Sequence, residues 1–195
     1  KTCVTYQHFT SPLWFTAIGG WEKRKNVDLY IRYAEKITKE LGNYSDMICT
    51  INEANLTSCF AHSFPSYPTG GMKTLMPFVG EAAKSCGSTL ENFGPFLFGH
   101  PFKIRDCMME AHVKSFPVIK ENLNNDQPVG ITLSIMDYQC VEGGELVRDE
   151  AHKESVDVCL DQTKNDDFIG IQTYTRHTFG PDGIITPNLK KSDML

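Results

Sequence analysis

Six polar side chains stand where short apolar runs of the 195-residue chain end, and side chains at such positions can bind or transform a ligand. They are His8, Asn52, Glu53, Asp137, Gln172 and Tyr174. Each run has the composition of a β-strand. Because the carboxyl ends of parallel strands meet at one edge of a sheet, we expect the six residues to share a rim. A converging ring of polar groups indicates function better than any single member does.

The pair Asn52-Glu53 suits the cleavage of a glycosidic bond. A carboxyl group in this position can protonate the leaving oxygen, while the amide beside it hydrogen-bonds a sugar hydroxyl. The position alone is equally consistent with a loop carboxylate or a carboxylate that caps a helix. His8 is consistent with a hydroxyl-binding residue or with a packed histidine. Tyr174 is consistent with a partner of a carboxylate or with packing, and we interpret Asp137 as structural.

The elements that would position these residues alternate along the chain. Strands are predicted at 2–7, 46–51, 128–136 and 167–174, and helices at 26–41, 103–123 and 151–164. This alternation predicts an α/β fold with a parallel sheet and right-handed crossovers, within one domain over 1–195. Asn26 is expected to cap the first helix and Gly42 to stop it. Pro117 is expected to kink the second helix or to break it in two.

The segment 55–102 is far longer than the usual connection of about 2–6 residues between a strand and its helix. It is rich in phenylalanine and glycine. We therefore expect a folded loop with a short helix near 76–86 at the mouth of the sheet. Its aromatic residues would form either a hydrophobic satellite cluster or a surface that faces the substrate.

Charge and motifs exclude several classes of function. A net charge of −5 does not attract phosphate backbones, so no nucleic acid is expected as a partner. No stretch approaches the ~18 apolar residues of a membrane helix. The sequence lacks the glycine-rich nucleotide motifs, the serine nucleophile elbow and the zinc-protease motif, so neither a cofactor nor a metal is expected. The polar end at 188–195 is expected to be loose.

The cysteine count is odd, at seven, and no two cysteines form a CxxC pair. A disulfide framework or a zinc site would need closer grouping. We therefore expect reduced, mostly buried thiols and a cytoplasmic location. The chain opens with residues that already resemble a strand, so a preceding segment, and any targeting signal in it, is expected to be missing.

Three segments together resemble glycoside hydrolase family 1, the β-glucosidase family, over roughly residues 3–187. The stretch YQHFTSPLWF at 6–15 is similar to the family's third-strand segment, which carries a sugar-binding histidine. The stretch TINE at 50–53 resembles the T-x-N-E-P signature of the acid/base. The stretch DFIGIQTYT at 167–175 resembles the sixth-strand segment, usually written with N-Y-Y-T. The Gly-Gly-Trp at 19–21 matches in spacing.

The resemblance implies a partial (β/α)₈ TIM barrel that covers about the third to the sixth βα units. It implies that Glu53 is the general acid/base of a retaining β-glucosidase-like enzyme and that Asn52 binds the 2-hydroxyl. His8 would bind another hydroxyl of the same sugar, Gln172 would contact the substrate, and Tyr174 would orient the nucleophile. Two positions depart from the pattern: alanine at 54 replaces the usual proline, and glutamine at 172 replaces the usual asparagine.

The family's nucleophile lies in a T-E-N-G-like segment of the seventh strand, and these 195 residues contain no such segment. The isolated chain is therefore expected to be inactive on β-glycosides and prone to aggregate through open sheet edges. The expected ligand is a small carbohydrate or an aryl or alkyl β-glycoside, with no membrane partner. A clan-related endoglycanase and a non-catalytic sugar-binding remnant stay open as alternatives, and the sequence does not indicate an oligomeric state.

Overall fold

Four parallel strands form the main sheet in the computed structural model, which describes residues 1–64 and 71–185. They are β1 (Cys3–Gln7), β2 (Met47–Asn52), β3 (Val129–Ser134) and β5 (Phe168–Gln172), in the order β1-β2-β3-β5. Each strand of this sheet pairs with the next one along the chain. The register sets Gln7 opposite Ile51 and Ser134 opposite Gln172. All four carboxyl ends therefore lie at one edge of the sheet.

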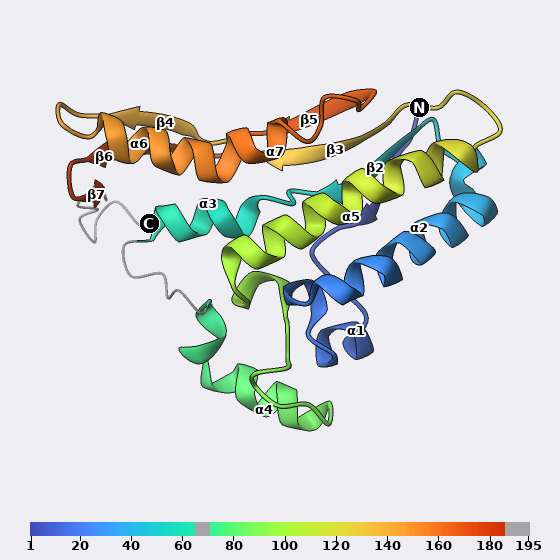
Figure 1. Cartoon of the computed structure of the whole chain (residues 1–195), viewed down its shortest axis with the longest axis horizontal. Helices are drawn as coiled ribbons and strands as arrows, with labels where there is room; N and C mark the ends of the chain where they lie inside the picture. The colour runs from blue at the N-terminus through green and yellow to red at the C-terminus, as the bar shows by residue number, and fades with distance from the viewer. Residues whose placement is uncertain (65–70, 186–195) are drawn as a thin grey trace.

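Helices connect these strands and lie on one side of the sheet (Figure 1). The helix α2 (Val27–Leu41) joins β1 to β2, and α5 (Pro101–Glu121) leads into β3. The connection to β5 consists of α6 (Glu145–His152), a π-helical turn (Lys153–Asp157) and α7 (Val158–Leu160). The predicted alternation of strands and helices in a parallel sheet is confirmed, although the last helix begins and ends earlier than expected.

The main core lies between the sheet and the pair α2 and α5, which pack against each other. Helix α2 buries a stripe with helical spacing, namely Val27, Tyr30, Ala34 and Thr38. From the sheet and α5, fully buried apolar side chains complete the core: Ile48, Ile131, Leu133, Ile104 and Met108. This apolar layer fixes the position of the strands and of the residues at their ends.

The side-chain cap predicted at Asn26 is corrected by the structure, and of the two alternatives for Pro117 the break is excluded. The Asn26 side chain does not cap α2, because its amide donates to the Gly20 carbonyl at 2.8 Å. Gly42 ends α2 as predicted, because it is the C-cap residue of the helix, and the chain then makes a 3₁₀ turn over Gly42–Tyr44. Pro117 does not break α5. The carbonyl that the proline leaves without a donor belongs to Val113, whose side chain is exposed, so water can satisfy it.

A second, smaller sheet was not predicted. It consists of β4 (Asp137–Cys140), β6 (Arg176–Gly180) and β7 (Gly183–Ile184). The chain leaves β3 and β5 at the carboxyl edge and pairs again as β4 and β6, which run parallel. Asp137 begins β4 and forms an ion pair with Arg176 at 2.6 Å, as its structural interpretation expects.

The long segment contains α3 (Leu56–Ser63), which was not predicted and packs against α5 in the body of the molecule. Its later part, around α4 (Pro77–Ser85), forms a lobe that projects from the body (Figure 1), and α4 matches the expected short helix. Val79, Ala83 and Phe93 form a small core of their own, which favours the satellite cluster over a substrate-facing surface. The predicted loose end at 188–195 lies outside the described residues.

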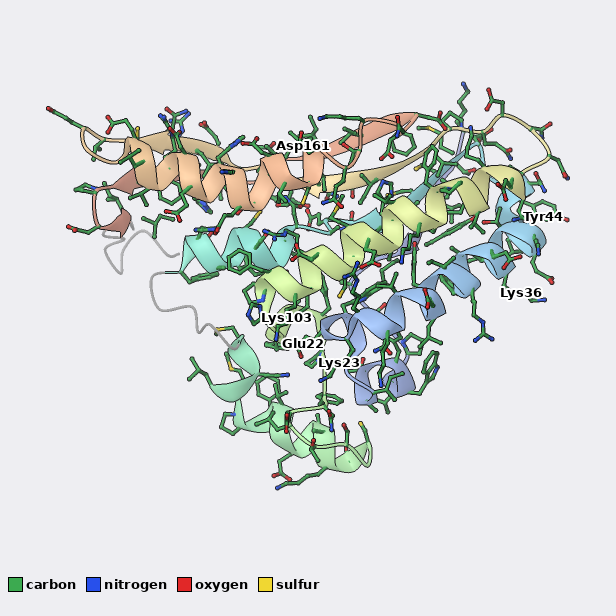
Figure 2. All side chains as sticks on the ribbon, in the orientation of Figure 1. Glu22, Lys23, Lys36, Tyr44, Lys103 and Asp161 are labelled. Atoms are coloured by element: carbon green, nitrogen blue, oxygen red, sulfur yellow. The ribbon has the colours of Figure 1, made fainter. Side chains whose placement is uncertain are left out.

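A buried ion pair fastens this lobe to the body of the molecule, near the short helix α1 (Leu13–Ala17). Glu22 lies at the junction (Figure 2) and accepts hydrogen bonds from the Lys73 ammonium at 2.6 Å and from the His100 backbone N–H at 2.9 Å. Both charged side chains are only 10% exposed. At the same junction Gly20 and Gly94 approach so closely that a Cβ on either would collide with backbone.

All seven cysteines lie within the described residues and are free thiols. Four of them are buried: Cys49, Cys59, Cys107 and Cys159. This agrees with the prediction of reduced thiols. Within 1–64 and 71–185, no helix has the length and apolar character that crossing a bilayer would need.

Candidate active site

Glu53 occupies the turn between β2 and α3 and is almost completely buried, with 2% of its surface exposed. Its backbone is left-handed, with φ of 48°, and its N–H donates to the Thr132 carbonyl at 2.9 Å. The carboxylate does not cap α3, whose N-cap residue is Asn55. One carboxylate oxygen, Oε1, is buried with no hydrogen-bond partner among the described residues. An acid held in this way is available to a ligand.

An irregularity in the strand pairing sets the direction in which the Asn52 side chain points. The register between β2 and β3 shifts between Cys49 and Asn52. Before the shift, Thr50 points toward α5, where its hydroxyl lies 2.8 Å from His112 Nδ1. Regular alternation would send Asn52 to that face as well. The bulge instead turns Asn52 to the face opposite the helices, where it meets side chains of β3 and β5.

Four side chains from three neighbouring strands form one hydrogen-bonded group there. Asn52 Oδ1 accepts from the Thr132 hydroxyl at 3.0 Å and from Gln172 Nε2 at 2.6 Å. Gln172 Nε2 also reaches the Thr132 hydroxyl at 3.0 Å, and the Tyr174 hydroxyl donates to Gln172 Oε1 at 2.5 Å. Asn52 Nδ2 is left buried without a partner among the described residues. Unpaired buried polar groups are costly, so this pattern favours a bound polar ligand.

Tyr174 connects this group to Glu53 electrostatically. Hydrogen bonding to Glu53, with burial and the negative charge of Glu53, raises the pKa of the Tyr174 phenol above its ordinary value. A nearby carboxylate disfavours the phenolate. Because 65% of Tyr174 is exposed, its hydroxyl marks the solvent side of the site.

His8 follows β1 at the same rim but is not part of the hydrogen-bonded group. Its ring packs edge-on against Phe9, at 4.8 Å between centroids, and Phe9 stacks on Phe96. His8 also lines a hollow of about 380 Å³ whose aromatic wall includes Trp14 and Tyr33. The structure thus gathers Asn52, Glu53, Gln172 and Tyr174, whereas His8 stands outside this group at the end of β1.

Two residues that the sequence did not single out hold the site together. Thr132 sits between Asn52 and Gln172, and its hydroxyl hydrogen-bonds both side chains. Asn55 is fully buried, and its amide donates to the carbonyls of Ser134 and Ser155 at 2.7 and 2.9 Å. Its Oδ1 accepts from the Ser134 backbone N–H at 2.8 Å, so the turn that carries Glu53 is fixed to β3. A threonine in mid-strand and an asparagine in a turn are too common to have pointed to either role.

A buried relay anchors β2 from the helix side. His112 of α5 is fully buried, and its Nε2 lies 3.0 Å from the Asp166 carboxylate. Its other ring nitrogen faces the Thr50 hydroxyl, two residues before Asn52. The relay therefore fixes the strand whose end carries the candidate acid.

The arrangement can transfer a proton and bind a neutral polar ligand. Two carboxylates were predicted to share the rim, Glu53 and Asp137. Of these, only Glu53 adjoins the hydrogen-bonded group. A double displacement at a sugar needs a second carboxylate about 5–5.5 Å away. In the part of the chain that is described, no group of three or more His, Cys, Asp or Glu residues could hold a metal ion.

Comparisons with known proteins agree on one family. The profile of Glycosyl hydrolase family 1 matches residues 1–178. The crystal structure of β-glycosidase BGL167 is 31% identical and superposes with a TM-score of 0.84 over 98% of this chain and 46% of that one. The apo structure of β-glucosidase 1317 is also 31% identical, with a TM-score of 0.79 over 96% and 45%.

Curated relatives match over shorter lengths. Beta-glucosidase A of Enterobacter agglomerans is 40% identical over 53 residues, which is 27% of this chain and 11% of that protein. A chloroplastic benzoxazinyl glucoside β-D-glucosidase of Triticum aestivum is 26% identical over 160 residues, which is 80% and 26%. The chain thus spans less than half the length of the relatives it matches.

Proposed function

Because this chain belongs to glycosyl hydrolase family 1 and forms part of its (β/α)₈ barrel, we propose that it carries the acid/base half of a retaining β-glycosidase active site. The proposed substrates are small carbohydrates and aryl or alkyl β-glycosides. The observation that supports this most is the pair of adjacent unpaired groups, Glu53 Oε1 and Asn52 Nδ2, buried at the rim of a parallel sheet. Folding alone gains nothing from leaving both without partners.

In the proposed mechanism Glu53 first acts as the general acid. Its carboxyl gives a proton to the glycosidic oxygen as the bond to the sugar breaks, and its carboxylate then takes a proton from the incoming water. Asn52 Nδ2 donates to the 2-hydroxyl, and His8 binds another hydroxyl of the same sugar. Tyr174, which already adjoins Glu53, orients the nucleophilic carboxylate.

We propose that the nucleophile comes from outside these 195 residues and that the isolated chain does not complete a turnover. Without an opposing carboxylate, no glycosyl intermediate forms, because a proton donor alone leaves the developing positive charge on the sugar unsupported. The isolated chain should then release no p-nitrophenol from p-nitrophenyl β-glucoside above the rate in buffer. Release that disappears in Glu53→Gln would contradict this proposal and place both steps within the chain.

Binding of a β-glycoside tests the site itself. The experiment is a titration of the isotope-labelled chain with methyl β-glucoside, and with methyl α-glucoside as a control, followed by NMR. We expect the β anomer to shift the side-chain signals of Asn52 and Tyr174. Glu53→Gln should alter this response, whereas Glu40→Gln, the same change at an exposed site of α2, should not. Equal responses to both anomers, or none at millimolar sugar, would argue against the proposal.

A non-catalytic sugar-binding role is the second candidate, because the hydrogen-bonded group adjoins a single carboxylate. The two roles differ in how binding depends on the Glu53 carboxyl group. In a general acid this group contacts the glycosidic oxygen, so Glu53→Gln should change the affinity for an aryl glycoside more than the affinity for free glucose. A binding protein should hold the two ligands with the same ratio of affinities in the wild type and in Glu53→Gln.

A further inference from the structure

Two acceptors compete for the single proton of the Tyr174 hydroxyl. In the structure this hydroxyl donates to Gln172 Oε1 at 2.5 Å. The Glu53 carboxylate is the second acceptor, because the same hydroxyl also hydrogen-bonds to it. A hydroxyl has one hydrogen to donate, so the Tyr174 proton belongs either to the amide or to the acid. The choice between them affects every other member of the hydrogen-bonded group.

The hydrogen-bonded group satisfies itself in two arrangements. In the first, which the structure shows, Gln172 Nε2 donates to Asn52 Oδ1 at 2.6 Å and to the Thr132 hydroxyl at 3.0 Å, and this hydroxyl donates to Asn52 Oδ1 at 3.0 Å. In the second, both amides are turned over, which exchanges oxygen and nitrogen within each amide and moves no other heavy atom. The three hydrogen bonds among these residues are then kept, and each one runs in the opposite direction.

The two arrangements differ at both ends of the group. At the Tyr174 end, the first offers Gln172 Oε1 as an acceptor, and the second offers Nε2 as a donor to the phenol oxygen. In the second arrangement the Tyr174 proton must therefore turn to Glu53. At the Asn52 end, the first arrangement leaves Nδ2 buried without a partner in the described part of the chain. The second leaves the oxygen Oδ1 in that place, so the polarity that Asn52 offers to a ligand is reversed.

The charge of Glu53 decides which arrangement is the more stable. An ionised carboxylate accepts a stronger hydrogen bond than an amide oxygen does, so it draws the Tyr174 proton and favours the second arrangement. A protonated Glu53 donates to the phenol oxygen instead, which leaves the Tyr174 proton for Gln172 and favours the first. A second carboxylate that reached Tyr174 from outside the chain would compete for the same proton and favour the second arrangement.

We propose that Gln172 is a positioning residue that passes the charge of Glu53 to Asn52, so that Asn52 presents a donor beside a protonated acid and an acceptor beside an ionised one. Residue 172 departs from the family's asparagine, and its amide contacts Tyr174, Asn52 and Thr132 at once. A ligand hydroxyl can follow this reversal because it both donates and accepts, whereas an ether oxygen only accepts. The identity of the ligand rests on the proposed function, and the reversal itself does not.

The test follows both amides by NMR in the isotope-labelled chain without any sugar, while the Glu53 Cδ resonance reports the charge of the acid. With Glu53 protonated, the NH₂ protons of Gln172 should show their strongest nuclear Overhauser effects to the Thr132 methyl group. With Glu53 ionised, these effects should move to the Tyr174 ring. The amide signals of Asn52 and Gln172 should titrate with the same midpoint as the Glu53 resonance.

Two other ionisable groups interact with Glu53 in the described part of the chain, namely the Tyr174 phenol just after β5 and the Cys59 thiol of α3. Burial raises the pKa of Cys59 to about 11, and hydrogen bonding to Glu53 raises the pKa of Tyr174 above its ordinary value. Both groups therefore stay neutral in the range where a carboxyl group titrates. The contact from β3 is Thr132, which does not titrate, so a change in the amide signals there reports Glu53.

Tyr174→Phe separates a relayed signal from the direct field of the charge. This variant keeps the ring, and its side chain is 65% exposed in the wild type, so the fold should be unaffected. The Asn52 amide should then stop responding to Glu53, whereas Tyr44→Phe, at an 85% exposed site, should behave like the wild type. An Asn52 response that persists in Tyr174→Phe would overturn the inference, as would Gln172 protons that keep the same neighbours in both charge states. Because no sugar is added, these outcomes do not depend on whether the chain binds a β-glycoside.

Discussion

The left-handed backbone of Glu53 lowers the stability of the fold. A non-glycine residue at φ of 48° is strained, and Glu53 also buries an unpaired carboxylate oxygen. Glu53→Gly should therefore be more stable than Glu53→Ala by about 1 kcal/mol, since both lose the carboxylate but only glycine relieves the backbone. Urea denaturation of the two variants measures this difference. Equal stabilities would show that the turn carries no strain.

The phenol of Tyr174 reports on the charge of Glu53. Because a neighbouring carboxylate disfavours the phenolate, hydrogen bonding to Glu53 holds the pKa of Tyr174 above its ordinary value. Glu53→Gln removes that charge, so the pKa should fall toward the ordinary value of about 10. A pH titration of the Tyr174 Cζ resonance follows this change, with Glu40→Gln as the control. If Tyr174 titrates in the same way with and without the Glu53 carboxylate, the charge of Glu53 does not influence the phenol and the prediction is wrong.

At this scale the sequence predicted which residues end the strands but not how they interact. Asn52, Glu53, Gln172 and Tyr174 were expected at a common rim, and the structure brings them together. Their proposed roles stay predictions. The roles of Thr132 and Asn55 could not be foreseen. They depend on a one-residue bulge and on the register between strands, and neither is visible in a single sequence.

Among the elements, α5 and β2 depend on the buried relay through His112. Replacing this fully buried ring by phenylalanine would leave the Asp166 carboxylate, which is 4% exposed, without its partner. His112→Phe should therefore lower the free energy of unfolding by about 3–5 kcal/mol, measured with urea. His152 is the control, because it pairs with Asp157 in an ion pair that is partly exposed on both sides. A loss no larger than that of His152→Phe would show that the relay does not anchor the strand.

The long helix and the main strands were predictable because their apolar residues repeat at regular intervals. The small sheet was not, because β4 and β6 continue almost directly from β3 and β5. The chain leaves β3 after Ser134 and pairs again from Asp137, so one predicted run covered the end of one strand and the start of another. The sequence left a kink or a break open at Pro117, and α5 is not broken there, since a helix tolerates proline where the unpaired carbonyl meets solvent.

For the molecule as a whole, the two outer strands of the main sheet are the places where self-association is expected to begin. β1 and β5 each pair with one neighbour among the described residues, and Ile171 of β5 is 66% exposed. Open strand edges with apolar side chains promote association. We expect the isolated chain to self-associate at micromolar concentration, and Ile171→Lys to reduce this in light scattering. Leu146→Lys, the same kind of change on exposed helix α6, should have little effect. A monodisperse wild-type monomer would contradict the expectation.

The strand order β1-β2-β3-β5 has a further consequence for how such a protein can be built. Each strand of the sheet lies outside the strands that precede it in the chain, and none lies between two earlier strands. Further strand and helix units can therefore be added beside β1 or beside β5 without breaking any hydrogen bond that already exists. The fold is additive at both flanks, and each added unit would lengthen the rim while Glu53 and its neighbours keep their places.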